Sequence, residues 1–269
     1  MTGTNESRSP AAADIPHDAG DHPDIVVSVI TPSFDSARFL GQTIESVQAQ
    51  TFAKWEMIIV DDGSSDDSVD VAKRYAAADA RIRPVALGRN VGAAVARNTA
   101  IEMARGRYIA FLDSDDLWKP DKLEKQIAFM RKHDCALSYG YYEKIDEAGV
   151  ATGKVMRAPD RVTYRDMLAK CHIGCLTAVY DRGRLGRVTM PLIRKRQDWA
   201  LWLKILKDAP YALGMREVLG AHRVRKGSIS SNKIEMVKYH WMVFREIEKL
   251  NLISASYYLA RNIYNKLRD

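Results

Sequence analysis

Blocks of apolar residues recur along residues 25–112, and their spacing predicts alternating strands and helices. Residues 25–30 are almost all apolar and β-branched, which is typical of a strand buried on both faces. Leu40, Ile44 and Val47 recur at helical spacing. The pattern predicts strands at 25–30, 57–60, 81–87 and 108–112, and helices at 37–50, 67–78 and 92–104. Because strand and helix alternate, we expect an α/β fold with a mostly parallel sheet and right-handed crossovers.

The pattern is less regular after residue 112. It predicts a helix from Pro120 to Lys132, a strand at 136–142, a hairpin turn at 146–149, a helix at 161–170, an extended segment at 175–180 and a helix at 197–207. Residues 233–269 are expected to be mostly helical. They carry an apolar stripe at helical spacing, which consists of Ile253, Tyr257, Ala260, Tyr264 and Leu267. Such stripes usually face a core, so a packing or dimer contact is favoured for it over a membrane contact.

Composition separates the first 24 residues from the rest of the chain. They contain almost no bulky apolar side chains, so a disordered tail is expected there. The 269-residue chain has a formal net charge of +7, and these 24 residues hold five acids and one base, so the remainder carries about +11. A basic surface favours anionic partners such as nucleotides, nucleic acid or acidic lipid, although it also simply promotes solubility.

Three cysteines in a chain of this length do not form a disulfide scaffold. Cys171, His172 and Cys175 lack a second pair of ligands at suitable spacing, so a zinc site is not expected. The sequence has no apolar run of about 18 residues and no signal-peptide pattern. We therefore expect a cytoplasmic protein, with attachment to the inner face of the plasma membrane still open.

Acidic residues follow two of the predicted strands. Asp113, Asp115 and Asp116 come directly after the strand at 108–112, and Asp61 and Asp62 follow the strand at 57–60. Ligands of such sheets bind beyond the carboxyl ends of the strands. The first cluster fits either a divalent-cation site or a capping turn, and the second fits either nucleoside contacts or a turn with a helix cap. The presence of both at one sheet edge favours the ligand interpretation.

The chain from Val27 to Lys122 resembles the inverting family 2 glycosyltransferases, which have the GT-A fold. The matching segments are VSVITPSF (27–34), IVDDGS (59–64), NVGAA (90–94), ARN (96–98) and FLDSDD (111–116). Downstream, MPLIRKRQD (190–198) and SISSNK (228–233) resemble the bacterial branch that builds teichuronic-acid-type and other surface polysaccharides. The resemblance implies a GT-A domain at 25–232, with a nucleotide-sugar half at 25–120 and an acceptor half at 121–232, followed by a C-terminal helical extension at 233–269.

The resemblance also implies roles in binding a nucleotide-sugar donor, expected to be a UDP-sugar. Thr31 and Pro32 would line the base pocket, and Asp62 would bind the uracil or its vicinity with Asp61 beside it. Asp113 would contact the ribose or the metal. Asp115 would ligate the Mn²⁺ or Mg²⁺ that bridges the donor diphosphate.

Two further roles follow from the downstream motifs. Asp198 matches the general base of the family, although an acid at a helix start is also common for electrostatic reasons alone. Arg223 matches an arginine that faces the diphosphate. Gln197 and His222 depart from the family pattern, which usually has Glu and an aromatic residue at these positions. The resemblance implies an acceptor that is lipid-linked or a polysaccharide.

Two other functions compete with the predicted metal-dependent glycosyltransferase. One is a non-catalytic, basic scaffold at a membrane surface that keeps a residual nucleotide pocket. The other is a nucleic-acid binder, which the high isoelectric point of about 9.2 allows. Acidic clusters at the ligand edge of the sheet would repel nucleic-acid phosphates, so no nucleic-acid partner is expected.

Overall fold

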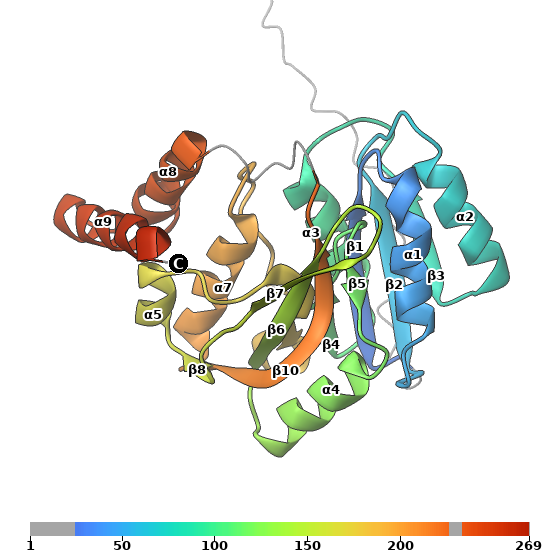
Figure 1. Ribbon diagram of the computed structural model, residues 1–269, viewed down its shortest axis with the longest axis horizontal. Helices are drawn as coiled ribbons and strands as arrows, with labels where there is room; N and C mark the ends of the chain where they lie inside the picture. The colour runs from blue at the N-terminus through green and yellow to red at the C-terminus, as the bar shows by residue number, and fades with distance from the viewer. Residues whose placement is uncertain (1–24, 226–232, 269) are drawn as a thin grey trace, which may run out of the picture.

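A single mixed sheet of ten strands runs through the molecule, with helices on both faces (Figure 1). The computed structural model describes residues 25–225 and 233–268. The predicted tail at 1–24 and residues 228–232 of the SISSNK motif lie outside the described residues. The strand order is β3-β2-β1-β4-β9-β6-β10-β5, with β7 paired to β6 and β8 paired to β10.

The first half of the sheet is parallel, as predicted. It contains β1 (Val27–Ser33), β2 (Trp55–Asp61), β3 (Ile82–Ala86) and β4 (Tyr108–Phe111). Their crossovers are α1 (Ala37–Gln48), α2 (Ser68–Ala78) and α3 (Ala93–Met103). Each predicted element is present, and the bounds differ by no more than three residues. The carboxyl ends of β1, β2 and β4 therefore share one edge, where Ser33 is in register with Asp61.

The second half of the sheet is mixed and was only partly predicted. The strand at 136–142 extends to β6 (Leu137–Ile145), and the hairpin turn leads into β7 (Ala151–Met156). The strand β10 (Ala212–Arg223) runs parallel to β6, and the short strands β5 (Leu117–Trp118) and β8 (Arg161–Val162) flank it. The pattern did not predict β10, because buried and half-exposed residues are mixed along it and two register shifts interrupt its pairing.

Two predicted segments have a different structure. The helix expected at 161–170 is limited to α5 (Tyr164–Ala169), because Arg161 and Val162 pair with β10 and Thr163 begins the helix with a capping box to Asp166. The extended segment expected at 175–180 is a 3₁₀ turn (Cys175–Thr177) followed by β9 (Val179–Asp181). Helices α4 (Lys122–Lys132) and α7 (Gln197–Asp208) agree with the prediction, and a short α6 (Arg182–Leu185) follows β9.

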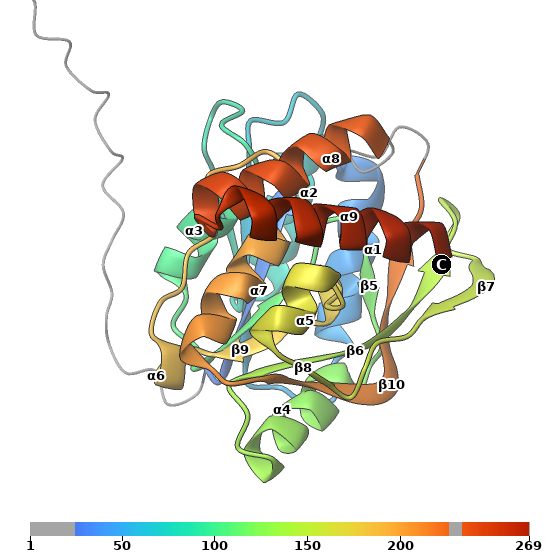
Figure 2. The ribbon, with the colours of Figure 1, turned by 90° about the vertical axis from the view of Figure 1, so that its left-hand side faces the viewer.

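The sheet separates two apolar cores. Helices α1, α2 and α4 cover one face, and α3, α5 and α7 cover the other (Figure 1). The chain then forms α8 (Lys233–Met242), a π-helical turn (Val243–Ile247) and α9 (Leu252–Arg268). These elements pack beside α5 and α7 (Figure 2), and they bury Val243, Phe244 and Ala255 in the second core. No helix among the described residues is both long and apolar enough to cross a bilayer.

The apolar stripe of the last helix does not face the core, so the predicted packing contact is wrong, whereas the dimer contact stays a prediction. Ile253, Tyr257 and Tyr264 are exposed to solvent. The buried face of α9 lies on the other side, where Ala255 and Asn262 pack and the Asn262 amide donates to the Leu168 carbonyl at 2.8 Å. The sequence pattern predicted the helix correctly. Because both faces of this helix are apolar, the pattern alone did not show which face packs on the core.

His240 of α8 packs edge-on against Trp199 of α7, with 4.9 Å between the ring centroids. Burial, together with Arg196 and Lys266, lowers the pKa of His240 to about 3 from 6.5. Above pH 6.5 the imidazole is neutral in the folded and unfolded chain alike. As the pH falls below 6.5, only the unfolded chain takes up the proton, so the free energy of unfolding decreases.

We predict that His240→Phe removes this pH dependence. Between pH 7 and pH 5 the wild type should lose about 2 kcal/mol more stability than the variant, on the order of what the pKa difference implies. Urea unfolding of both proteins at the two pH values measures the difference. Parallel pH profiles would show that the imidazole is not buried against Trp199.

Candidate active site

The acidic turn after β2 shapes the loop in front of α3. The Asp61 carboxylate accepts hydrogen bonds from the backbone N–H and the hydroxyl of Ser64, the former at 2.9 Å. Asp62 accepts from the backbone N–H groups of Val91 and Gly92, at 2.7 and 2.8 Å. Both carboxylates are buried, so they hold the loops on which a nucleoside would rest.

Gly63 permits this close approach of the two loops. Its φ is +74°, and a Cβ built at this position would lie 2.4 Å from the backbone carbon of Arg89. Any other residue would therefore be strained and would push the loop away.

The end of β1 presents one exposed aromatic ring. Thr31 and Pro32 are both buried, and the Thr31 hydroxyl has no hydrogen-bond partner among the described residues. Phe34, two residues further on, is 47% exposed. Thr31 and Pro32 thus lie inside the strand end, and Phe34 is the exposed aromatic residue that follows them.

Asp113 is connected to the helix α7 through Arg97. The Arg97 guanidinium pairs with the Asp113 carboxylate at 2.5 Å. With the Gln197 amide oriented so that its oxygen faces α3, this oxygen accepts from Arg97 Nη1 at 2.7 Å. Arg97 is almost fully buried, and burial alone would lower its pKa, but the charge of Asp113 offsets this effect and holds the pKa above its usual value. One buried arginine therefore links β4 to the start of α7.

Asp115 lies beside Arg225, whose Nε is 2.7 Å from the carboxylate. Burial, with repulsion from Asp116 and Asp113, raises the pKa of Asp115 to about 6. Asp115 is paired with one arginine, but it also lies close to two other carboxylates. Binding of a further positive charge is therefore favoured at this turn.

Asp116 is a buried anchor for the end of β10. Its carboxylate accepts from the Arg223 backbone N–H at 2.9 Å and lies 3.1 Å from His222 Nδ1. This hydrogen bond is the main reason that the pKa of His222 is raised. The imidazole of His222 forms this hydrogen bond with Asp116, so the histidine that replaces the usual aromatic residue at position 222 has a structural role.

Arg223 lies beneath the acidic cluster, and its side chain is not on the surface of the site. The residue is 2% exposed. Its guanidinium donates to the carbonyls of Asp115 (2.8 Å), Asp146 (3.3 Å) and Glu147 (2.9 Å) and to the Gln42 amide oxygen (2.8 Å). All of the guanidinium nitrogens of Arg223 are thus engaged with protein groups. The arginine that pairs with the side-chain carboxylate of Asp115 is Arg225.

Asp198 is the second residue of α7 and is half-buried. Arg196, which precedes the helix, has a left-handed φ of 66°, and Lys195 forms an ion pair with Glu235 of α8 at 2.6 Å. The buried Trp199 donates to the Met167 carbonyl at 2.8 Å, which fixes the other side of this turn. The ion pair to α8 and the hydrogen bond to α5 therefore fix the start of α7. Asp198 lies close enough to Arg97 to contribute to the raised pKa of Arg97.

The oxygen ligands of Asp113 and Asp115 have the chemistry that Mn²⁺ or Mg²⁺ requires. Within residues 25–225 and 233–268, no group of three or more His, Cys, Asp or Glu side chains is arranged to hold a metal ion. Two carboxylates would suit an ion that takes its remaining ligands from water and a diphosphate.

Burial raises the pKa of the Cys171 thiol to about 12, so this cysteine is protonated at neutral pH and is a poor ligand.

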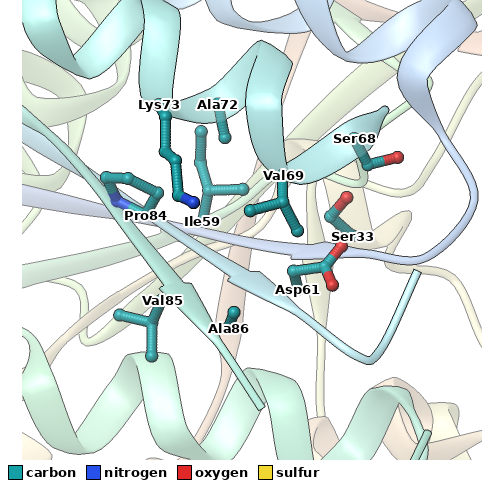
Figure 3. A pocket seen from close by; sticks show the side chains of 10 residues that line it. All are labelled: Ser33, Ile59, Asp61, Ser68, Val69, Ala72, Lys73, Pro84, Val85 and Ala86. Carbon is teal, nitrogen blue, oxygen red and sulfur yellow. The ribbon is translucent and has the colours of Figure 1, made fainter. Parts of the chain in front are cut away.

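A small pocket lies between α2 and the ends of β1, β2 and β3 (Figure 3). Ser33 and Asp61 line one end, and Lys73 and Pro84 line the other. Its volume of about 50 Å³ is too small for a nucleotide sugar, which needs a cleft of roughly 300 Å³ or more. The pocket shares only Asp61 with the acidic strand ends, so it is separate from the candidate site.

Sequence reasoning did not assign roles to Arg97, Arg225 or Phe34. The ARN motif contains Arg97, but packing and pocket-lining roles could not be separated. The structure separates the roles of its last two residues, because Arg97 contacts Asp113 while Asn98 exchanges hydrogen bonds of 2.8 and 2.9 Å with the Met190 backbone. Arg225 could have been noticed only as a second basic residue near Arg223.

A parallel nucleotide-binding half, a mixed second half and carboxylates at the shared strand ends define a GT-A type glycosyltransferase. The sequence matches Glycosyl transferase family 2 over residues 28–220, and the chain belongs to this family.

Two curated bacterial relatives match almost the whole chain. A putative teichuronic acid biosynthesis glycosyltransferase of Bacillus subtilis, TuaG, is 46% identical over 90% of this chain and 96% of its own length. WfgD of Escherichia coli, a UDP-Glc:α-D-GlcNAc-diphosphoundecaprenol β-1,3-glucosyltransferase, is 40% identical over 89% of this chain and 93% of its own length. The chain is therefore similar over about nine-tenths of its length to glycosyltransferases of cell-surface polysaccharide synthesis.

Solved structures support the fold. TarS 1–349 of S. aureus, in complex with UDP-GlcNAc, has a TM-score of 0.70 at 20% identity and covers 89% of this chain and 72% of its own. The mannosyltransferase PcManGT of Pyrobaculum calidifontis, in complex with GDP-Man and Mn²⁺, has a TM-score of 0.64 at 18% identity and covers 92% and 72%.

Arg223 and Arg225 are expected to respond differently to removal. Arg223→Ala removes a side chain that is 2% exposed, together with its hydrogen bonds to three carbonyls and the Gln42 amide oxygen, so the free energy of unfolding should fall by about 3 kcal/mol. Arg225→Ala breaks a partly exposed ion pair and should cost no more than about 1 kcal/mol. Urea unfolding of the two variants measures the contrast. Equal losses would contradict the buried role of Arg223.

Proposed function

We propose that this protein is a metal-dependent, inverting glycosyltransferase that transfers a sugar from a UDP-sugar to a hydroxyl of a lipid-linked acceptor. The observation that carries the proposal is that Arg97 pairs with Asp113, two residues from Asp115, and also lies close enough to Asp198 for the Asp198 charge to raise the Arg97 pKa. Family membership supports the reaction class, and the site geometry supports the roles.

The nucleoside would lie at the ends of β1 and β2. Phe34 offers an exposed ring on which a base can stack, and such stacking contributes about 1–3 kcal/mol per base. Asp62 fixes the Val91 and Gly92 amides beside this surface, and Asp61 fixes the turn at Ser64. Thr31 and Pro32 would support the pocket from inside the strand.

The diphosphate would lie over Asp113 and Asp115. A divalent cation, Mn²⁺ or Mg²⁺, held by these two carboxylates would neutralise the charge that develops on the leaving diphosphate. Arg225 now pairs with Asp115, and in the proposal its guanidinium binds a phosphate oxygen when the donor is present. This assigns to Arg225 the role that the family resemblance gave to Arg223.

Asp198 would act as the general base. The acceptor oxygen forms a bond to the anomeric carbon, the bond from that carbon to the phosphate oxygen breaks, and its electron pair leaves with UDP. The acceptor proton passes to the Asp198 carboxylate. A single displacement inverts the anomeric centre. Arg97 would position this carboxylate relative to the donor, because it donates to the amide oxygen of Gln197, the first residue of α7.

The donor and acceptor classes rest on the relatives. WfgD is a glucosyltransferase that uses UDP-Glc and an α-D-GlcNAc-diphosphoundecaprenol acceptor, and TarS was solved with UDP-GlcNAc. We extend the UDP-sugar and the lipid-linked acceptor to this chain as classes, without a choice of sugar. A lipid-linked acceptor places the reaction at the inner face of the plasma membrane, so peripheral contact through the C-terminal helices is part of the proposal.

The metal role is tested with Asp115→Asn. The affinity for UDP in the presence of Mn²⁺ should fall at least about tenfold, because a carboxylate ligand is lost. The variant should be no less stable than the wild type, since burial and repulsion already disfavour the Asp115 charge. Calorimetric titration with and without Mn²⁺ measures the affinity, and Asp121→Asn on the exposed start of α4 is the matched control. Undiminished Mn²⁺-dependent binding would contradict the assignment.

The base is tested with Asp198→Asn. Sugar transfer, or slow hydrolysis of the donor by water, should fall at least about a hundredfold, while UDP-sugar affinity stays within about twofold. Asp208→Asn, at the opposite end of the same helix, should retain wild-type turnover. If the wild type itself never exceeds the uncatalysed rate with any UDP-sugar, the non-catalytic scaffold replaces the enzyme as the better account.

A further inference from the structure

Helix α9 has two apolar faces, and the fold uses only one of them. The inner face packs on the second core through Ala255, Tyr258, Leu259 and Asn262. The opposite face, termed the α9 outer face, consists of Leu252, Ile253, Tyr257, Ile263 and Tyr264, all exposed. Ile253, at 83%, is the most exposed large apolar side chain of the described residues. Several large apolar side chains exposed together on one helix face are typical of a site that contacts another molecule or a membrane.

The charged residues of α9 itself are all basic, and the exposed Asp166 of α5 lies close enough to Arg261 to interact with it. The sequence of α9 contains Arg261, Lys266 and Arg268 and no acidic residue, and the exposed Lys249 lies three residues before it. Arg261 donates to the Tyr257 hydroxyl at 2.8 Å, so a cation borders the apolar side chains directly. Apolar side chains and tyrosines flanked by basic residues are the composition of helices that lie in the headgroup region of an anionic bilayer.

The position of α9 allows contact with a flat surface. The helix lies on the outside of the molecule, beside α5 and α7 and away from α1 and α2 (Figures 1 and 2). Its 17 residues span roughly 25 Å, and it packs along the domain rather than projecting from it. Such a helix would bind in the plane of the membrane.

A second copy of the chain fits the same face less well. A two-fold symmetric dimer through α9 would bring two acid-free, basic helices against each other. An anionic lipid surface has the opposite charge and requires no partner residues. The charge therefore favours the bilayer over a dimer.

We propose that the α9 outer face is a docking surface for an anionic phospholipid bilayer, with Ile253 and Tyr264 inserted and Arg261 at the headgroups. The choice of a bilayer as occupant rests in part on the lipid-linked acceptor of the proposed function. The face is more than the general membrane contact proposed above, because it assigns the contact to five side chains and excludes the inner face of the same helix.

The test uses the full chain and vesicles that contain no acceptor. Flotation with phosphatidylethanolamine–phosphatidylglycerol vesicles should recover the wild type, and phosphatidylcholine vesicles should recover at least about tenfold less. Ile253→Ser/Tyr264→Ser should lower recovery on the anionic vesicles at least about tenfold. The matched control, Val150→Ser/Val155→Ser on the exposed β7 hairpin, should bind as the wild type does.

Three outcomes would overturn the inference. They are absence of wild-type binding, equal binding of the α9 variant, and a wild-type dimer in light scattering that the α9 variant converts to a monomer, which would assign the face to a second copy. Donor hydrolysis in solution is measured on the same samples. If the wild type hydrolyses the donor but does not bind the vesicles, only the docking surface is contradicted, whereas vesicle binding by the wild type without any hydrolysis contradicts only the proposed reaction.

Discussion

Repulsion among three carboxylates within four residues is the constraint that organises this site. Asp113, Asp115 and Asp116 follow one buried strand. The charge of each carboxylate is balanced by a basic group that lies far from this turn in the sequence. Arg97 comes from α3, Arg225 follows β10, and His222 lies at the end of β10. Since none of these partners is local in sequence, the acidic turn is stable only when the fold has brought both halves of the sheet together.

The same contacts connect the acidic turn to the start of α7. Arg97 touches Asp113 on one side and Gln197 on the other, so the proposed metal-binding turn and the helix that carries the proposed base share one buried guanidinium. Arg223 supports the backbone of Asp115 from below and closes the loop at 146–147. In this account the catalytic carboxylates are positioned by buried arginines that do not react, and a small displacement of either would misplace the reacting groups.

The parallel half of the fold could be predicted because short apolar strands alternate there with helices, and acids follow two of the strands, β2 and β4. The strand β10 could not, because its twelve residues alternate irregularly and its pairing with β6 is interrupted twice. Within the site, spacing located the acids but not their partners. Arg97 is 16 residues from Asp113 and Arg225 is 110 residues from Asp115 in the sequence, and only the folded sheet places them together. The apolar stripe on α9 could be found from its helical spacing. That it is exposed could not be predicted, because α9 has a second apolar face and this other face packs on the core.

The most direct test of the central claim is a crystal structure with UDP and Mn²⁺ bound. The account predicts Mn²⁺ at the carboxylates of Asp113 and Asp115, the Arg225 guanidinium on a phosphate oxygen, and the Arg223 guanidinium still in place beneath them. Mn²⁺ and diphosphate bound away from this turn, or Arg225 still paired with Asp115 beside a bound UDP, would contradict it.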